Sequence, residues 1–139
     1  MITIRIPASI EQLKPLRETI SKELPEKYRE LQFKAELITE EILTNICKYA
    51  YDGKGGDTTF SCGMACFDNN DVFLIEITDA GSEYNPFANI DEQFESTIET
   101  RKIGGVGLFL VQQMASHYVY MRNENRNKLQ IFLLPGSDV

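Results

Sequence analysis

The chain has 139 residues, of which 42% are hydrophobic and 25% are charged, and its formal net charge at pH 7 is −7. These values are typical of one soluble globular domain, over residues 1–139, that is long enough to bury its own core. The negative charge argues against binding to nucleic acid or to an anionic membrane, and no run of residues predicts a membrane span. Because the N-terminus also lacks a signal-peptide layout, we expect a cytoplasmic protein.

The first half of the chain predicts one strand and two helices. Residues 3–7 alternate between apolar and polar side chains, as a half-buried strand does. Ser9 and Gln12 have the spacing of a helix capping box, and the helix that follows is predicted to end near Leu24. A second, longer helix is predicted over residues 35–51.

The second half predicts two strand pairs, separated by an irregular segment and a helix. The predicted strands are residues 58–67 and 72–78, joined by the turn "DNND", and residues 118–123 and 128–134, joined by the polar turn "ENRN". Residues 80–104 are predicted to be irregular with one short helix, and residues 106–116 to be helical. This order predicts an α+β fold in which a mostly antiparallel sheet carries its helices on one face.

The three cysteines and the single histidine argue against a redox or metal site. Cys62 and Cys66 lie in the first strand of the predicted hairpin, and alternation places both on one face as small core residues. Cys47 lies on the long helix, and His117 lies between a helix and a strand with no nucleophile motif nearby. We therefore expect neither a disulfide, a Cys/His metal site nor a Ser-His-Asp triad, and we interpret His117 as a surface or capping residue.

The helix over residues 35–51 places polar side chains beside its apolar stripe. The centre of that stripe is formed by four residues: Ile38, Ile42, Ile46 and Tyr49. Glu41 and Asn45 lie one turn apart on one flank, and Lys48 follows a turn later. In one interpretation these are exposed i,i+4 pairs, each contributing about 0.2–0.5 kcal/mol. In the other, an amide oxygen binds Mg²⁺, a carboxylate activates a nucleophile and an ammonium contacts phosphate.

The second strand of the first predicted hairpin ends at an aspartate. Three apolar residues share one face of this strand by alternation: Phe73, Ile75 and Ile77. Asp79 continues that face toward the core, where a carboxylate is costly unless it finds hydrogen-bond donors. One interpretation is an Asx turn closed with Gly81. The other is that Asp79 accepts a hydrogen bond from the exocyclic amine of a purine, while Gly81 lets the backbone approach the base.

A glycine-rich segment leads into the third predicted helix. Gly104, Gly105 and Gly107 place free backbone N–H groups at a helix start, and this arrangement binds phosphate. Glycines at this position also serve helix packing or act as a hinge. The segment is not a Rossmann fingerprint, because Leu110 stands where a third glycine is needed and no strand precedes it. A Walker A loop is absent from the sequence.

The three segments, in this order, resemble the GHKL ATPase superfamily, which includes gyrases and histidine kinases. The stretch "EEILTNICKYAY" resembles its N box, with Glu41 and Asn45 in the Glu-x-x-x-Asn positions. "DAGSEYNP" resembles the Asp-x-Gly box, and "GGVGLFLV" resembles the second glycine box. The resemblance covers residues 2–134. It is closest to the stand-alone anti-sigma-factor serine/threonine kinases of bacterial partner switching, because the chain is small and shows no dimerisation-and-phosphoacceptor region.

This resemblance implies a fold, two ligands and roles for several residues. The fold is the Bergerat-type two-layer α/β sandwich with a mixed, mostly antiparallel sheet, and the ligands are ATP and Mg²⁺. Asn45 would coordinate Mg²⁺, Glu41 would act as general base or hold the attacking group in line, and Lys48 would contact phosphate. Asp79 would bind the adenine amine, and Gly81 would shape the adenine pocket.

The resemblance also assigns a wider set of nucleotide-binding positions, whose glycines would bring the backbone to the phosphates: Tyr49, Tyr84, Gly104, Gly105, Val106, Gly107 and Leu108. Residues 88–103 fall where the family has its ATP lid, and this segment contains the cations Arg101 and Lys102. Many family members have a histidine at the position of Tyr49. Many also have a threonine near the base in the last strand, where we expect Gln130.

Two functions from different classes follow from the resemblance. In the first, the chain is a kinase that uses Mg·ATP to phosphorylate a serine or threonine of a small antagonist protein of the anti-sigma factor. In the second, it is an ATP-binding module that sequesters a sigma factor or another regulator with little or no phosphotransfer. Glu41 favours the kinase, because binding alone needs no base, whereas the short lid favours the module. Family members often pair, so a homodimer is one possible state.

Overall fold

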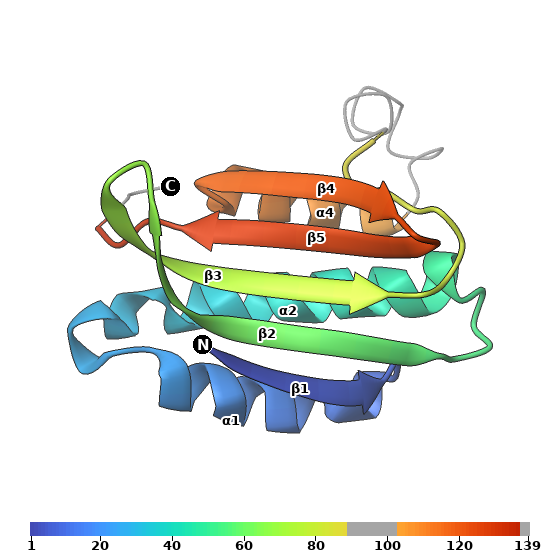
Figure 1. Cartoon of the computed structure of the whole chain (residues 1–139), viewed down its shortest axis with the longest axis horizontal. Helices are drawn as coiled ribbons and strands as arrows, with labels where there is room; N and C mark the ends of the chain where they lie inside the picture. Colours follow the sequence, from blue (N-terminus) through green and yellow to red (C-terminus); the bar gives the residue numbers. More distant parts are fainter. Residues whose placement is uncertain (89–102, 137–139) are drawn as a thin grey trace.

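The computed structural model, whose elements are labelled in Figure 1, describes residues 1–88 and 103–136. The strands are β1 (Ile2–Pro7), β2 (Asp57–Phe67), β3 (Asn70–Asp79), β4 (His117–Asn123) and β5 (Arg126–Leu133). The helices are α1 (Leu13–Glu23), α2 (Gln32–Asn45) and α4 (Ile103–Met114), with the shorter turns η1 (Ile10–Gln12), η2 (Glu26–Leu31) and η3 (Ile46–Ala50). Within these described ranges, no helix combines the length and the apolar character that a membrane crossing requires.

The strands form one sheet in the order β1-β2-β3-β5-β4, and the long helices cover one of its faces (Figure 1). α2 contacts both α1 and α4, so it is the central helix of its layer. This arrangement confirms the predicted α+β two-layer sandwich. All pairings between the described strands are antiparallel, which makes the sheet more uniform than the mixed sheet that we expected.

Two tight turns set the pairing of the hairpins. Asp68 and Asn69 join β2 to β3 with φ of 51° and 64°, and Glu124 and Asn125 join β4 to β5 with φ of 52° and 61°. Positive φ at both central residues is the type I′ geometry, whose twist matches that of the flanking strands. The turns predicted at "DNND" and "ENRN" are therefore confirmed, and they fix the register of both hairpins.

The apolar stripe of α2 packs into the core, as predicted, but it ends one turn early. Ile38 and Ile42 are 0% and 1% exposed, and full burial of such a side chain contributes about 1.5–3 kcal/mol. Ile46 is also buried, whereas Tyr49 is 44% exposed. The cause is η3, a π-helical turn that starts directly after Asn45 and shifts the helical phase away from the 3.6-residue period.

Two local predictions differ from the structure. Ser9 accepts a hydrogen bond from the Glu11 N–H at 3.3 Å, but it caps η1, and α1 begins only after that turn. Cys62 is buried as predicted, whereas Cys66 is exposed. Cys66 lies at the end of β2 next to the hairpin turn, where the burial of this strand decreases.

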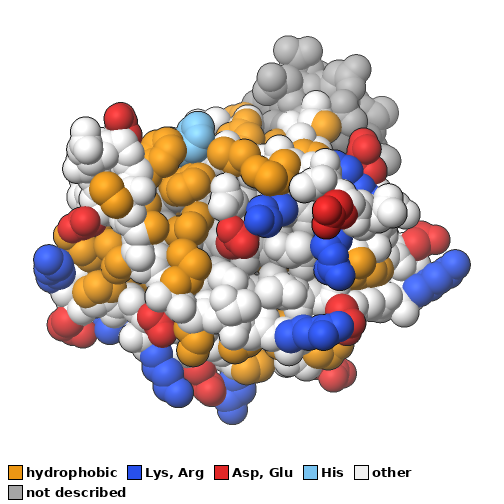
Figure 2. Space-filling model, in the orientation of Figure 1, with side chains coloured by type: hydrophobic (Ala, Val, Ile, Leu, Met, Phe, Trp, Pro, Cys, Tyr) orange, Lys and Arg blue, Asp and Glu red, His pale blue; other side chains and the backbone are white. Residues whose placement is uncertain are grey.

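Among the described elements, none covers the opposite face of the sheet, which carries an aromatic cluster. Hydrophobic side chains gather there toward the β2–β3 hairpin (Figure 2). The ring centroid of Phe67 lies 4.9 Å from that of His117 and 4.8 Å from that of Phe132, and the centroids of His117 and Phe132 are 5.6 Å apart. His117 is exposed, which confirms its interpretation as a surface histidine. Elsewhere on this face Lys128 lies 3.9 Å from Glu76.

Ile38→Ala tests the packing of α2. We expect the free energy of unfolding to fall by about 2–5 kcal/mol, because the substitution leaves a cavity at a fully buried position. The measurement is urea unfolding followed by circular dichroism. Phe33→Ala is the matched control on the same helix: Phe33 is 72% exposed, so its truncation should change stability by less than about 0.5 kcal/mol. Equal losses in the two variants would contradict the packing described.

Candidate functional site

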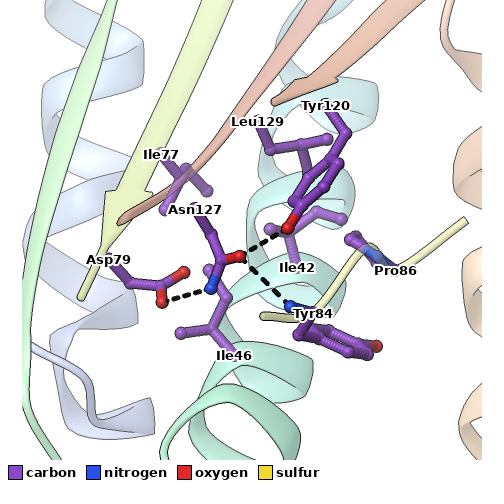
Figure 3. A pocket seen from close by; sticks show the side chains of 9 residues that line it. All are labelled: Ile42, Ile46, Ile77, Asp79, Tyr84, Pro86, Tyr120, Asn127 and Leu129. Atoms are coloured by element: carbon purple, nitrogen blue, oxygen red, sulfur yellow. Dashed lines mark hydrogen bonds between the residues drawn. The ribbon is translucent and has the colours of Figure 1, made fainter. Parts of the chain in front are cut away.

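Two of the predicted segments meet at a small cavity between α2 and the sheet (Figure 3). Its lining comes from α2, η3, three strands and the loop after β3: Ile42, Ile46, Ile77, Asp79, Tyr84, Pro86, Tyr120, Asn127 and Leu129. The walls are mostly apolar, and hydrogen-bonding groups gather at the end where β3 stops. An apolar cavity with a few convergent polar groups is the usual form of a small-molecule site.

Asp79, the last residue of β3, points into the core as predicted and is 2% exposed. Its Oδ1 accepts hydrogen bonds from the Gly81 N–H at 2.9 Å and from Asn127 Nδ2 at 2.8 Å. The Asx turn with Gly81 is thus present. Within the part of the chain that the structure describes, no group donates to Oδ2, so this second oxygen remains an acceptor for a ligand. The structural and the ligand-binding interpretations of Asp79 are therefore compatible.

Asn127 at the start of β5 is a site residue that the sequence analysis missed. Its amide is 3% exposed and makes four hydrogen bonds. Oδ1 accepts from the Tyr84 N–H at 3.1 Å and from the Tyr120 hydroxyl at 2.6 Å. Nδ2 donates to Asp79 Oδ1 and to the Ser82 carbonyl, both at 2.8 Å. These partners determine which end of the amide faces Asp79, since the reversed amide would oppose donor to donor and acceptor to acceptor.

The expectation that Gln130 lies near the base is wrong. Gln130 lies on the uncovered face of the sheet, where its Nε2 donates to Glu76 at 2.8 Å. The register of β3 and β5 pairs Asp79 with Asn127 instead. The error is one of parity, because neighbouring residues of a strand face opposite sides. Every second residue of β5 faces the core: Leu129, Ile131 and Leu133. The same alternation places Asn127 on the core face, so the sequence contained the information needed to choose Asn127 over Gln130.

The close approach of the Ala50 backbone explains why position 81 is a glycine. A Cβ at Gly81 would lie 2.4 Å from the carbonyl oxygen of Ala50, the last residue of η3. That carbonyl also accepts a hydrogen bond from the Ser82 N–H at 2.8 Å, and the Gly81 carbonyl accepts one from Arg122 Nη1 at 2.7 Å. The turn after β3 is thereby held against the end of η3. A contact of Gly81 with a bound base stays a prediction.

Asn45 ends α2 with its amide fixed and 2% exposed. Nδ2 donates to the Glu41 carbonyl one turn earlier at 2.7 Å, which leaves Oδ1 facing away from the helix backbone. The Tyr84 hydroxyl lies 3.4 Å from this Oδ1, and burial raises the pKa of Tyr84, so the hydroxyl is a donor at neutral pH. The Tyr84 ring packs beside Tyr49 with centroids 5.3 Å apart. An amide oxygen held in this way is a suitable ligand for Mg²⁺.

Glu41 lies one turn before Asn45 and is half-buried. Burial raises the pKa of its carboxyl group; the neighbouring charge of Glu40 adds to the effect, and the charge of Lys48 opposes it. Lys48 is exposed in η3. A carboxylate with a raised pKa is a stronger proton acceptor than an ordinary one, so this position suits a general base.

The glycine segment forms the first turns of α4 and approaches α2. Gly104, Gly105 and Val106 lie in the first turn, where backbone N–H groups have no partner within the helix; their surroundings lie outside the described part of the chain. Gly107 faces the Glu41 carboxylate. Leu108 is buried in the core, so only its backbone can contribute to a ligand site.

The predicted ATP lid at residues 88–103 falls almost wholly outside the described residues. The same is true of the predicted lid cations Arg101 and Lys102. The described site therefore consists of α2, η3, the end of β3 with its loop, Tyr120 of β4, the start of β5 and the glycine end of α4.

Comparison with known protein families gives one finding. The family model of the histidine kinase-like ATPase domain matches residues 6–133, which includes every segment of the site described above. A search of the curated proteins finds no match.

Asn127→Ala tests the amide that supports Asp79. The variant leaves buried partners unpaired, so we expect the free energy of unfolding to fall by about 1–3 kcal/mol and ATP affinity to fall about tenfold, equivalent to about 1.4 kcal/mol. Urea unfolding and isothermal titration calorimetry measure the two effects. Gln130→Ala is the matched control on the same strand, and it should leave ATP affinity unchanged. A similar loss of affinity in both variants would contradict the assignment of Asn127 to the site.

Proposed function

The chain belongs to the histidine kinase-like ATPase domain family, and on that premise we propose that it is a cytoplasmic anti-sigma-type protein kinase. It uses Mg·ATP to phosphorylate a serine or threonine of a small antagonist protein in a partner-switching system. The observation that carries the proposal is the placement of Glu41 and Asn45. They lie one helical turn apart and directly precede Ile42 and Ile46, which line the cavity together with Asp79.

The apolar walls and the free acceptor of the cavity support our proposal that the adenine base binds there. The cavity as described is small, about 10 Å³, so its walls must separate to admit the base. Ile42 and Ile46 on the helix side and Ile77 on the sheet side supply apolar walls for a flat base. Asp79 Oδ2 is the acceptor for the exocyclic amine of adenine. Guanine carries a carbonyl oxygen at the equivalent ring position, and this oxygen would oppose the carboxylate. The site should thus prefer adenine, because the oxygen that receives no hydrogen bond in the described structure, Asp79 Oδ2, is an acceptor.

In this proposal, polar residues of α2 and η3 bind the phosphates of ATP and the Mg²⁺ ion. Asn45 Oδ1 is the group that would hold Mg²⁺, and the bound ion supplies neutralisation of phosphate charge. The Tyr84 hydroxyl, 3.4 Å from Oδ1, lies next to the proposed ion site. Lys48 is exposed one turn further on, and in this proposal its ammonium contacts phosphate.

Glu41 accounts for phosphotransfer. The hydroxyl oxygen of the substrate protein attacks the γ-phosphorus of ATP, and the bond from that phosphorus to the β–γ bridging oxygen breaks, so that ADP leaves. Glu41 takes the proton of the hydroxyl group. Its raised pKa brings the carboxylate closer to the range in which a general base is most effective at neutral pH.

A second candidate function is a nucleotide-binding module that sequesters a sigma factor or another regulator with little or no phosphotransfer. One observation favours it: the Tyr84 hydroxyl engages Asn45 Oδ1 in the described conformation. A site that keeps its metal ligand occupied by a tyrosine would bind nucleotide without assembling the transfer geometry.

Glu41→Gln separates the two functions. The protein is incubated with γ-labelled Mg·ATP and a lysate of its source cells, and label on a small protein is measured. As a kinase, the variant should lose transfer by a factor of about 10²–10⁴ while ATP affinity stays within about threefold. Glu40→Gln is the matched control: Glu40 pairs with Arg17 at 3.2 Å, so transfer should persist. ATP binding without label transfer in any form would favour the module.

Asp79→Asn tests the base site under either function. The amide replaces an acceptor by a donor at one oxygen position, so ATP affinity should fall about tenfold or more, as expected when a buried hydrogen-bonding group loses its partner. Calorimetric titration with ATP and with GTP measures the loss and any change of preference. Unchanged ATP affinity would contradict the assignment of the cavity to adenine.

A further inference from the structure

Gly107, on α4, lies directly against the carboxylate of Glu41 on α2. A Cβ at position 107 would lie 2.3 Å from Glu41 Oε2, 2.7 Å from Cδ and 3.0 Å from Oε1. Real Cβ atoms do not approach other atoms to 2.3 Å. No side chain at position 107 is therefore compatible with the observed place of the carboxylate.

We infer that Gly107 is a positioning residue, whose missing side chain forms the slot that holds the Glu41 carboxylate at the phosphate end of the site. The inference rests on the proposed function, in which Glu41 is the general base. It gives Gly107 a role different from backbone contact with phosphate. A backbone N–H survives substitution by alanine, whereas the slot does not.

The helix itself gives no reason for glycine at this position. Gly107 lies in the α-helical region, and it is not among the glycines with positive φ, which are Gly53, Gly55, Gly63 and Gly136. Glycine in a helix interior is less favourable than alanine by about 0.8–1.0 kcal/mol. Backbone conformation would thus favour alanine at position 107. The atoms that a Cβ would meet belong to the end of the flexible Glu41 side chain, so alanine fits only if the carboxylate moves away.

Few other contacts hold the carboxylate. Asn45 Nδ2 bonds to the Glu41 backbone carbonyl and not to the side chain. Within residues 1–88 and 107–136, no group donates a hydrogen bond to Glu41 Oε1 or Oε2. Packing against Gly107 and the charges of Glu40 and Lys48 are therefore what the described structure offers to place this side chain.

The slot also sets the electrostatics of Glu41. Burial is the main cause of its raised pKa; Glu40 on α2 adds to the effect and Lys48 on η3 opposes it. α4 itself carries no charged residue between Ile103 and Met114. A Cβ at position 107 would move the carboxylate toward water, so its pKa should fall. The rate of transfer needs the deprotonated carboxylate, and its rise with pH should then begin at a lower pH.

Gly107→Ala is the first test. We expect a folded protein of equal or higher thermal stability and an ATP affinity within about threefold of the wild type. Displacement of a catalytic group by about 1 Å can cost about 100-fold in rate, so the transfer rate should fall by about that factor. Leu110→Ala, an exposed position of the same helix, is the matched control and should keep the wild-type rate. A wild-type rate and pH profile in Gly107→Ala would overturn the inference, and so would an equal loss of rate and ATP affinity.

A double substitution tests the contact itself. Aspartate is one methylene shorter than glutamate, so Glu41→Asp withdraws the carboxylate from position 107. With Gly107 present, Glu41→Asp should lower the transfer rate, whereas in the Gly107→Ala background the same change should raise it. A decrease in both backgrounds would overturn the inference.

An NMR titration of the Glu41 side-chain carboxyl carbon distinguishes failure of the slot from failure of the proposed kinase function. The pKa of Glu41 should be lower in Gly107→Ala than in the wild type, whether or not the protein transfers phosphate. Absence of transfer in the wild type would contradict the proposed kinase function. An unchanged Glu41 pKa in Gly107→Ala would contradict the slot.

Discussion

The buried Asn127 amide joins β5 to the end of β3, to the loop that follows β3 and to β4 through four hydrogen bonds. A buried amide is costly unless its donors and acceptors are paired, so these segments are stable together only in one arrangement. That arrangement also presents Asp79 to the cavity. Stability and site geometry therefore depend on the same side chain, although Asn127 and Asp79 are 48 residues apart in the sequence.

α2 packs against the core on one side and carries Glu41 and Asn45 beside that packed side. Ile38 and Ile42 are buried in the core, which holds the helix rigid against the sheet. The bond from Asn45 to the Glu41 carbonyl then fixes the direction of an amide oxygen. The π-helical turn follows at once and turns the next residues away from the core, including Tyr49. Such turns often occur at functional sites, and here one lies directly after Asn45 and leaves Tyr49 exposed.

The parts of this structure that follow from local rules were predictable. The two hairpins, the inward direction of Asp79 and the stripe of α2 follow from turn residues and from periods of 2 and 3.6. Asn127 and Gln130 show the limit: a position near the end of a strand needs the register, and an error of one residue reverses the face. Tyr49 shows another, since a π-helical turn changes the period without an obvious sequence signal. The contact of Gly107 with Glu41 depends on how two helices pack, and no period specifies that.

Gly81 and Gly107 lie in different motifs, yet the structure gives both the same physical reason. Gly81 admits the Ala50 carbonyl, and Gly107 admits the Glu41 carboxylate. Both neighbours belong to the continuous segment of α2 and η3, so the turn after β3 and the glycine end of α4 approach one helical segment at two points. Each glycine leaves room for its neighbour before any ligand binds. The spacing of the motifs along the chain thus reflects how the site is assembled around α2, and contacts with nucleotide would be added to an arrangement that packing has already fixed.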